Sequence, residues 1–439
     1  MTAFNPVSQS SRIIALDVLR GVALLGILLM NIPGFSMAEY STEAFKSNPN
    51  DLNFWVRGVV NTVFEGKMRA LFSAIFGAGI ILFTINKERG GESATALFYR
   101  RMAWLVVFGL IHSHILLWAG EILYYYGVIG MIAFIFRKMK PVYLVMAIPL
   151  VAIVEFVANT IFFQDIREKR IAYVEAMGAQ KNNQELTVEQ TKALAEWRDI
   201  EVSLIPNKED AAEHTRLMKG DYASVASYVR RISWDGQTTY LIYGLWDPLA
   251  LMLLGIALFK WGFLTLEWTR SQYIKTIIIG YGLGFPLSLW YFYYNYHTFP
   301  TLEASLNHIE VTPIEWMNLI YPTQRILLMM GHAALVLVFI QSHWVPWLLD
   351  RLRAVGQMAF TNYIVHTVIC TLIFFGYGLN YYAELEYYQI YFVVAAIWIL
   401  QILYSKPWLN RYLFGPLEWL WRSLTYWKIQ PMRREKTNH

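Results

Sequence analysis

The chain has 439 residues, of which 56% are hydrophobic and only 16% are charged, and its formal net charge is +5. Soluble domains carry about 25% charged residues, so this composition excludes an ordinary soluble enzyme and indicates a membrane protein with several spans. The basic residues lie at the ends of apolar segments rather than on one face, which argues against nucleic acid as a partner. The single cysteine, Cys370, excludes a disulfide framework and a cysteine-based metal site, and no metal is expected.

The first apolar segment, 12–31, reads RIIALDVLRGVALLGILLMN and predicts a membrane-spanning helix. No small-residue cleavage site follows it, so we expect a retained anchor rather than a cleaved signal peptide. Asp17 and Arg20 lie one helical turn apart and are expected to pair, either at the membrane edge or as part of a site. Asn31 lies about three turns further along the same face.

Hydropathy predicts about ten spans and hence an all-α polytopic membrane protein. The expected spans lie at 14–35, 66–85, 102–119, 121–136, 141–163, 238–261, 272–294, 316–341, 355–377 and 387–405. Loops rich in Lys and Arg alternate with poorer ones, so the positive-inside rule predicts that both termini lie in the cytoplasm.

The predicted organisation has four parts. Residues 1–163 form an N-terminal membrane half that carries the candidate site, and 238–405 form the second membrane half. Between them, 164–237 is polar and mixed in charge, and the number of preceding spans places it outside, as helices laid over the outer face. Residues 406–439 combine apolar and basic faces with several Trp side chains, which predicts an interfacial helix and a basic tail at the cytoplasmic leaflet.

Polar groups of the first membrane half are expected to converge near the outer surface. Glu65, Lys67 and Arg69 lie at the outer end of the second span, His112 lies above the middle of the third, and Glu121 ends it. Such a cluster supplies what general acid–base chemistry needs. Taken alone, His112 is better explained as a neutral histidine bonded to a neighbouring helix. Glu65, Lys67 and Arg69 are equally well explained as an ion-paired turn at the membrane surface.

The second membrane half adds further polar groups. Arg325 is the most informative, because a guanidinium inside the membrane needs either a cavity, an anionic ligand or a carboxylate, and Asp247 is the available carboxylate. Asn362, His332 and His366 also lie within predicted spans. We do not expect the latter two histidines to carry the chemistry.

Several segments resemble the YeiB-like family of bacterial membrane proteins, which is described as a domain of unknown function. The resemblance rests on RIIALDVLRGVALLGILLMN, EGKMRALFSAIFGAGI, RRMAWLVVFGLIHSHILLWAGEILYYYGVIG, VGQMAFTNYIVHTVICTLIFFGYGL and FGPLEWLWRSLTY, which reach both ends of the chain. That family is in turn similar to transmembrane acyltransferases such as heparan-α-glucosaminide N-acetyltransferase and enzymes that O-acylate envelope polysaccharides. The resemblance implies a bacterial inner-membrane protein that moves an acyl group from cytoplasmic acyl-CoA to a sugar on the far side.

The resemblance also implies roles for particular residues. The polysaccharide enzymes carry Arg or Lys, ten further residues and then His on an early span, and the matching positions here are Arg20 and Asn31. An amide does not titrate, so Asn31 is expected to hold the carbonyl oxygen of the donor, and His112 becomes the expected general base. Glu65 or Glu121 is then expected to orient His112 or to balance its charge.

The expected donor is acetyl-CoA or another acyl-CoA, whose phosphates would meet Arg100 and Arg101 on the cytoplasmic side. The acceptor would be a hydroxyl or amine of an envelope glycan or lipid. Substrate contacts are expected from Asp17, Arg20, Lys67, Arg69, Arg325 and Asn362. Two other function classes stay open, a permease whose path is lined by the same polar residues, and a lipid-binding or envelope-organising protein without turnover. Membrane lipids are expected partners, and the association of two copies is left open.

Overall fold

The computed structural model describes residues 9–38, 48–89, 94–204 and 208–434. The polar start of the chain, part of the segment between the first two expected spans and the last residues of the basic tail fall outside these ranges. Within them the regular secondary structure consists of helices and one isolated β-bridge between Tyr412 and Arg433, and turns and loops join the helices. The protein is an all-α polytopic membrane protein, as its composition predicts.

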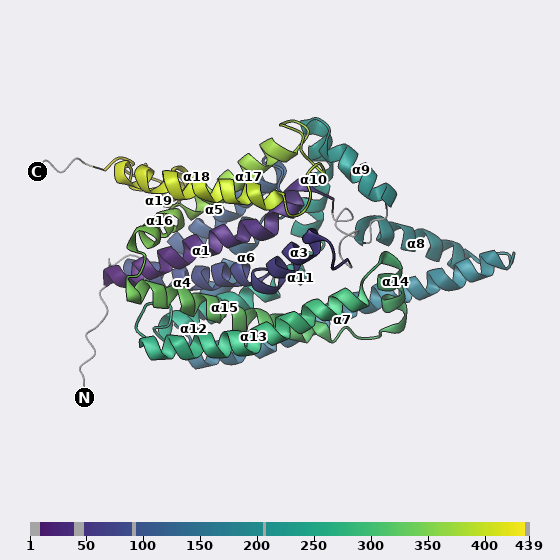
Figure 1. Ribbon diagram of the computed structural model, residues 1–439, viewed down its shortest axis with the longest axis horizontal. Helices are drawn as coiled ribbons and strands as arrows, with labels where there is room; N and C mark the ends of the chain where they lie inside the picture. The colour runs from purple at the N-terminus through teal and green to yellow at the C-terminus, as the bar shows by residue number, and fades with distance from the viewer. Residues whose placement is uncertain (1–8, 39–47, 90–93, 205–207, 435–439) are drawn as a thin grey trace, which may run out of the picture.

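The helices follow one another as a bundle with a projecting arm (Figure 1). The first part of the chain forms α1 (Gln9–Ser36), α3 (Leu52–Val63), α4 (Lys67–Arg89), α5 (Ala94–His114), α6 (Leu123–Ile135) and α7 (Pro141–Lys181). The polar middle forms α8 (Val188–Leu204), α9 (Lys208–Met218), α10 (Tyr222–Gln237) and α11 (Leu241–Gly244). The last part forms α12 (Trp246–Lys260), α13 (Arg270–Thr298), α14 (Leu302–Val311), α15 (Met317–Ser342), α16 (Pro346–Gln357), α17 (Ala359–Phe374), α18 (Ile390–Arg411) and α19 (Pro416–Tyr426).

Seven helices of the described chain are long and apolar enough to cross a membrane, and α16 with α17, bent by 82°, gives an eighth if the pair is one span. The expected span 121–136 corresponds to α6, which has 13 residues. The expected span 272–294 lies within α13, which has 29 residues. The count of ten requires both of these helices to cross as well, and it stays a prediction.

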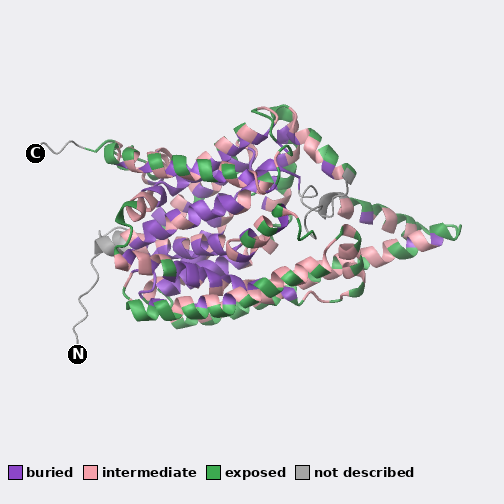
Figure 2. Cartoon of the chain, in the orientation of Figure 1, coloured by how far each residue is buried: buried purple, intermediate pink, exposed green. Residues whose placement is uncertain are grey.

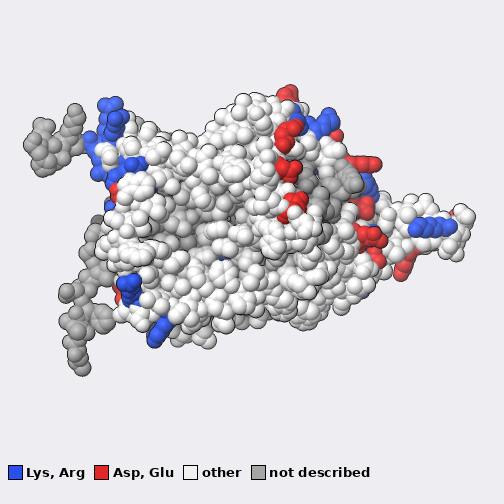
Figure 3. Space-filling view, viewed as in Figure 1, with Lys and Arg blue, Asp and Glu red and all other residues white. Residues whose placement is uncertain are grey.

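The two ends of the bundle differ in charge. The first turns of α1 and the ends of α18 and α19 lie at one end, and α8 to α10 lie at the other (Figure 1). Lys and Arg predominate at the first end, whereas the second end carries Asp and Glu together with some Lys and Arg, and an almost uncharged band lies between the two ends (Figure 3). This distribution is what the positive-inside rule requires of an orientation with α1 starting in the cytoplasm. We refer below to the basic end and the acidic end.

Helix α1 lies in the middle of the bundle, whereas α7 lies on its surface (Figure 2). In the 18-residue apolar stretch of α1, 72% of the residues are buried inside the protein, against 6% in the corresponding stretch of α7. Glycines explain how closely α1 packs on α16, because a Cβ at Gly21 would collide with the Leu352 carbonyl and one at Gly356 with the Asp17 carbonyl. The polar half of α1 is thereby held against α16.

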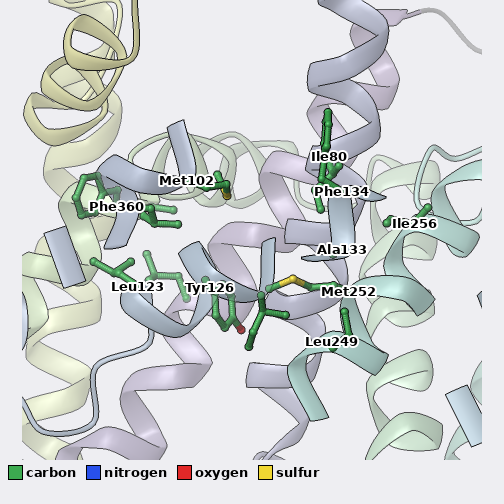
Figure 4. Packing of buried hydrophobic residues seen from close by; sticks show 14 of the residues in the cluster. Ile80, Met102, Leu123, Tyr126, Ala133, Phe134, Leu249, Met252, Ile256 and Phe360 are labelled. Carbon is green, nitrogen blue, oxygen red and sulfur yellow. The ribbon is translucent and has the colours of Figure 1, made fainter. Parts of the chain in front are cut away.

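Helix α12 packs on α4 in the same manner. A Cβ at Gly77 would collide with the Met252 carbonyl, and one at Gly255 with the Ala74 carbonyl. Met252 shares its core with Tyr126 of α6, as Figure 4 shows. This close packing places the first turn of α12 beside the first turns of α4.

The polar segment does not begin at a break in the chain. Helix α7 runs for 41 residues without interruption across the expected boundary at 163 and 164, and α8 lies along its far end (Figure 1). Helix α10 covers the acidic end of α5, where Arg230 donates to the His114 carbonyl at 2.8 Å and Tyr222 donates to the Ile115 carbonyl at 2.9 Å. Only part of the segment therefore lies over the bundle as expected, and α8 forms an arm with α7.

Candidate functional site

A cavity lined by polar and aromatic side chains lies toward the acidic end, between α3, the start of α4, the second half of α13, α14 and the start of α15. We call it the outer pocket, and its volume is about 410 Å³. Its polar lining includes Arg57, Asn61, Glu65, Lys67, Ser288, Asn295, Ser305 and Gln324, and its aromatic lining is Phe54, Tyr291, Phe292, Tyr296, Phe299 and Tyr321. A concave site with a few converging polar groups among aromatic rings is the usual form of a small-molecule site.

A tight turn between α3 and α4 carries Glu65 and leads into Lys67, and the side chains of both residues line the pocket. Gly66 has φ +69°, in the left-handed region that glycine adopts without strain. A Cβ at this position would also collide with the Tyr321 hydroxyl and crowd the Arg325 side chain. The neighbouring Glu65 accepts a hydrogen bond of 2.7 Å from the Tyr321 hydroxyl. The sequence FEGK therefore requires its glycine for both conformation and space.

Lys67 is buried, and its ammonium group is held in the pocket wall. It donates to the Asn61 carbonyl at 2.8 Å and to the Ser288 hydroxyl at 3.4 Å. Gln324 is also buried, and its Oε1 has no hydrogen-bond partner within the described chain. An unpartnered buried acceptor costs free energy, so the outer pocket favours a ligand that brings a hydrogen-bond donor.

Behind the pocket lies a buried charge network centred on Asp247. Arg325 makes two hydrogen bonds to this carboxylate, one of them at 3.1 Å, and Arg69 lies 3.1 Å from it. The pairing of Arg325 with Asp247, left open above, is thus confirmed. Two guanidinium groups share one carboxylate, and Glu155 of α7 lies within electrostatic reach of all three groups. The Arg69 side chain keeps 40% of its surface accessible within the described chain.

His112 lies in a second polar cluster, between α5 and α17, and does not line the outer pocket. Its Nε2 is 2.7 Å from the Thr367 hydroxyl, and its ring meets the Tyr363 ring edge to face at 5.0 Å. His112 Nδ1 has no hydrogen-bond partner among the described residues. The expectation that a carboxylate orients His112 is therefore wrong, because Thr367 takes that position.

The carboxylate of Glu121 caps the start of α6. It accepts two hydrogen bonds from the Tyr124 amide, at 2.9 and 3.1 Å, at the start of α6. A carboxylate at a helix N-terminus satisfies a free N–H and interacts favourably with the helix dipole. This contact explains the residue without a catalytic role.

Three polar side chains form hydrogen bonds between helices, namely Asn362, His332 and His366. The Asn362 amide donates to the Val355 carbonyl at 3.1 Å and accepts from the Tyr404 hydroxyl, close to the bend between α16 and α17. Both ring nitrogens of His332 have partners, and His366 Nε2 is 2.8 Å from Gln401 Oε1. The expected substrate contact of Asn362 has no support in this arrangement.

The remaining expected residues lie toward the basic end. Asp17 and Arg20 pair at 3.0 Å as predicted, and Gln357 also donates to Asp17 at 3.0 Å. Arg101 lies over the Trp421 ring at 4.1 Å, within electrostatic reach of the Arg20 guanidinium.

Two other expected residues stand apart from the outer pocket. Arg100 lies 5.8 Å from the Trp427 ring. Asn31 is half-buried on α1, and it is not part of the pocket lining. The structure thus brings Glu65, Lys67, Arg69 and Arg325 together, and places His112, Asn31 and the basic-end residues elsewhere.

Sequence reasoning missed several of the polar groups. Glu155 is the only acidic or basic residue in the apolar stretch 141–163, and that isolation was a usable signal. Tyr321 and Gln324 stand in an ordinary amphipathic pattern and give no local signal. Glu418 of α19 accepts from the Phe360 and Thr361 amides at 2.7 and 3.0 Å, so it caps the start of α17 across a large sequence separation.

These features define an integral membrane protein of α-helices with a polar pocket toward one end and a buried charge network behind it. Residues 258–428 match the family described as "Protein of unknown function (DUF418)". The chain is 27% identical to "Uncharacterized protein YxaH" of Bacillus subtilis (strain 168), over 99% of each chain. It is 26% identical to "Uncharacterized protein YeiB" of Escherichia coli (strain K12), over 94% of this chain and 96% of that one.

A third relative, the "Uncharacterized 39.9 kDa protein in amylase 3'region" of Bacillus acidopullulyticus, is 25% identical over 98% of this chain and 99% of its own. No solved structure is similar to the chain. The comparisons confirm the resemblance to the YeiB-like family that the motifs indicate. The printed names of these relatives assign no activity.

Proposed function

We propose that the protein is an integral-membrane acyltransferase that moves an acyl group, acetyl in the simplest case, from cytoplasmic acyl-CoA to a hydroxyl or amine of an envelope glycan or lipid. The observation that carries the proposal is the outer pocket, which combines a carboxylate, an ammonium group and six aromatic side chains at the end predicted to face outside. The motif resemblance described above supplies the reaction class.

The outer pocket suits a hydroxylated acceptor. Aromatic rings pack on the apolar faces of sugar rings and lipid glycerol groups, and the free Gln324 Oε1 accepts a hydrogen bond from a ligand hydroxyl. The ammonium of Lys67 and the guanidinium of Arg57 make the pocket less favourable for a cationic ligand. The acceptor is therefore a neutral or anionic molecule in this proposal.

Acyl transfer requires a proton acceptor and a stabiliser of negative charge. The acceptor O–H bond breaks as its oxygen bonds to the thioester carbon, the C–S bond breaks, and the CoA thiolate takes up the proton. Glu65 is placed to receive the proton first, because its carboxylate lines the pocket and is held by Tyr321. Lys67 is placed to stabilise the oxyanion.

Basic side chains near the basic end are the proposed binding site for the donor phosphates. Arg101 lies within electrostatic reach of Arg20 and Arg422, so three guanidinium groups surround one region beside α19. Phosphate groups are the anions that such a cluster favours. In this proposal Asp17 holds Arg20 in place through the ion pair of 3.0 Å.

His112 is the second candidate for the proton acceptor. Its buried Nδ1 has no hydrogen-bond partner in the described chain. A reacting group or a water molecule beside it would satisfy this atom. In this variant of the proposal the reaction takes place between α5 and α17, and the outer pocket binds a different part of the acceptor.

The test is release of free thiol from acetyl-CoA by purified protein in nanodiscs, with and without added envelope glycans. Glu65→Gln should lower the rate by about 100-fold or more if the carboxylate is the proton acceptor. Glu303→Gln is the matched control, because Glu303 is exposed on α14 and does not line the pocket. Absence of acetyl-CoA turnover and of acetyl-CoA binding in the unmodified protein would contradict the proposal.

One observation favours a permease instead. The polar groups run inward from Glu65 through Tyr321, Arg325 and Asp247 to Arg69. Such a line of groups is typical of a solute path. Swelling of proteoliposomes in iso-osmotic glucose, abolished by Arg69→Gln, would support transport and exclude a purely enzymatic role.

A further inference from the structure

A second cavity, separate from the outer pocket, lies at the basic end. Its volume is about 350 Å³, and it lies between the end of α4, the turn after α6, the end of α12 and the loop that follows. Three basic side chains, Arg137, Lys138 and Lys260, line it beside an apolar wall of Ile81, Ile85 and Phe259. We call it the basic cavity.

Only some of the basic groups in the basic cavity have hydrogen-bond acceptors. Lys260 donates to the Arg137 and Met139 carbonyls at 2.6 and 2.5 Å, which fixes the turn after α6. Arg137 donates to the Phe134 carbonyl at 3.1 Å, but its buried Nε has no partner among the residues described. Within the same part of the chain, no carboxylate or hydrogen-bond acceptor contacts the Lys138 ammonium.

One carboxylate, Glu267, belongs to the lining. It accepts a hydrogen bond of 3.1 Å from the Thr265 hydroxyl, and it balances one of the three cations. The cavity therefore keeps an excess of positive charge, and an anionic group entering it meets Lys138 and the free Nε of Arg137. A phosphate has enough acceptor oxygens to satisfy both.

The surroundings of the cavity are apolar. Met139, Val142 and Tyr143, at the start of α7, are all exposed, as is Trp261 next to Lys260. Exposed Trp and Tyr side chains at the end of a span mark the membrane–water interface. A phosphate in the cavity is thus beside a surface on which hydrocarbon chains can lie.

We infer that the basic cavity binds the phosphate of an anionic phospholipid from the cytoplasmic leaflet, with the acyl chains against the start of α7. Basic pockets between spans at the cytoplasmic side recognise lipid headgroups in this way. The apolar wall favours an amphiphile over inorganic phosphate or a nucleotide, which offer the same phosphate chemistry without hydrocarbon. The inference does not depend on the proposed acyl transfer.

The experiment is native mass spectrometry of delipidated protein with added phosphatidylglycerol, phosphatidylcholine or inorganic phosphate. We expect phosphatidylglycerol to be retained in preference to phosphatidylcholine, and inorganic phosphate not to displace it. Lys138→Gln should weaken phosphatidylglycerol binding about fivefold, because one basic residue near a membrane surface is worth that much. Lys140→Gln is the matched control, since Lys140 is exposed two residues away and does not line the cavity.

Arg137→Gln gives a second variant, read together with the thermal unfolding temperature because Arg137 also contacts Phe134. Equal binding of the two lipids, or unchanged preference in Lys138→Gln, would overturn the inference. Displacement of the lipid by inorganic phosphate at equal concentration would show a soluble phosphate site instead, and would overturn it as well.

Discussion

The hydroxyl of Tyr321 donates a hydrogen bond of 2.7 Å to Glu65, and this bond joins residues 256 positions apart. The Tyr321 ring also lies beneath the Arg325 guanidinium, at 4.9 Å. One side chain of α15 therefore connects the carboxylate of the outer pocket with the charge network around Asp247. We therefore expect a substitution in the outer pocket to disturb the charge network around Asp247, and a substitution in the network to disturb the pocket.

Tyr321→Phe tests this connection. The substitution keeps the ring under Arg325 and removes only the hydroxyl, so Glu65 loses its donor. Hydrogen bonds to charged groups contribute about 1.5–3 kcal/mol, and we expect a loss of that size in the free energy of unfolding in detergent. Tyr293→Phe on α13 is the control, because Tyr293 is exposed and does not line the outer pocket. Equal unfolding temperatures for the Tyr321 variant and the unmodified protein would contradict the prediction.

Asp247→Asn is expected to destabilise the protein by about 3–5 kcal/mol, because it leaves Arg325 and Arg69 without their shared carboxylate inside the bundle. Adding Arg325→Met removes one of the two unbalanced cations. The double variant should therefore unfold at a higher temperature than Asp247→Asn alone. A double variant that is less stable than the single one would show that charge balance does not hold these residues together.

The sequence predicted those parts of the fold that depend on local pattern. Asp17 and Arg20 pair because their spacing puts them on one face of α1, and this spacing can be read from the sequence. The outer pocket was not predictable, since its aromatic wall comes from α3, α13 and α15 together. Glu418 illustrates the same limit, because the amides that it caps lie at the start of α17 and no local rule pairs the two segments.

The depth of a residue along its span does not determine which side chains it contacts. Glu65 and His112 were expected to meet because both lie toward the outer ends of their spans. Glu65, in the turn before α4, lines the outer pocket, whereas His112 of α5 contacts Thr367 of α17, so the two side chains belong to different clusters. Composition and periodicity fix a helix's buried face only approximately when the whole helix is apolar.

The polar segment offers a pH-dependent contact. His214 of α9 stacks on Tyr228 at 4.0 Å and lies 3.2 Å from the Tyr382 hydroxyl, and burial lowers its pKa from 6.5 to about 4. The unfolded segment therefore takes up a proton first as the pH falls below about 6.5, and stability is lost between that pH and about 4. The loss is at most roughly 3 kcal/mol.

Hydrogen exchange of α9 and α10 at pH 7 and pH 5 measures this effect. Exchange should be faster at pH 5, after correction for the intrinsic rate, and His214→Gln should remove the difference. His343→Gln, at an exposed position near the basic end, serves as the control. The same pH dependence in both variants would assign it to other groups.

Topology is tested by labelling introduced cysteines. Cys370 is fully buried, so the background from the native thiol is low. We expect Asn183→Cys, in the turn between α7 and α8, to react with a membrane-impermeant maleimide added outside intact cells. His343→Cys, in the turn between α15 and α16, should react only after permeabilisation. The opposite pattern would invert the predicted orientation.

The last prediction separates the two candidate proton acceptors. If Glu65 receives the proton, Glu65→Gln should lower acetyl-CoA turnover by about 100-fold or more, while His112→Ala should keep most of it. If His112 receives it, the pattern reverses, because its free Nδ1 is then the reacting atom. Glu65→Gln removes a carboxylate that interacts with the buried Lys67 ammonium, which keeps its hydrogen bonds to the Asn61 carbonyl and the Ser288 hydroxyl. Thermal unfolding therefore checks that both variants fold.

His114→Ala is the control for the histidine. His114 lies two residues from His112 on another face of α5, and its Nε2 is 3.0 Å from Gln237 Oε1 of α10. It should affect the attachment of α10 and leave turnover nearly unchanged. Equal loss in His112→Ala and His114→Ala would mean that both histidines act through the structure of α5. Full turnover in all three variants would exclude Glu65 and His112 as proton acceptors, and with them the proposed mechanism.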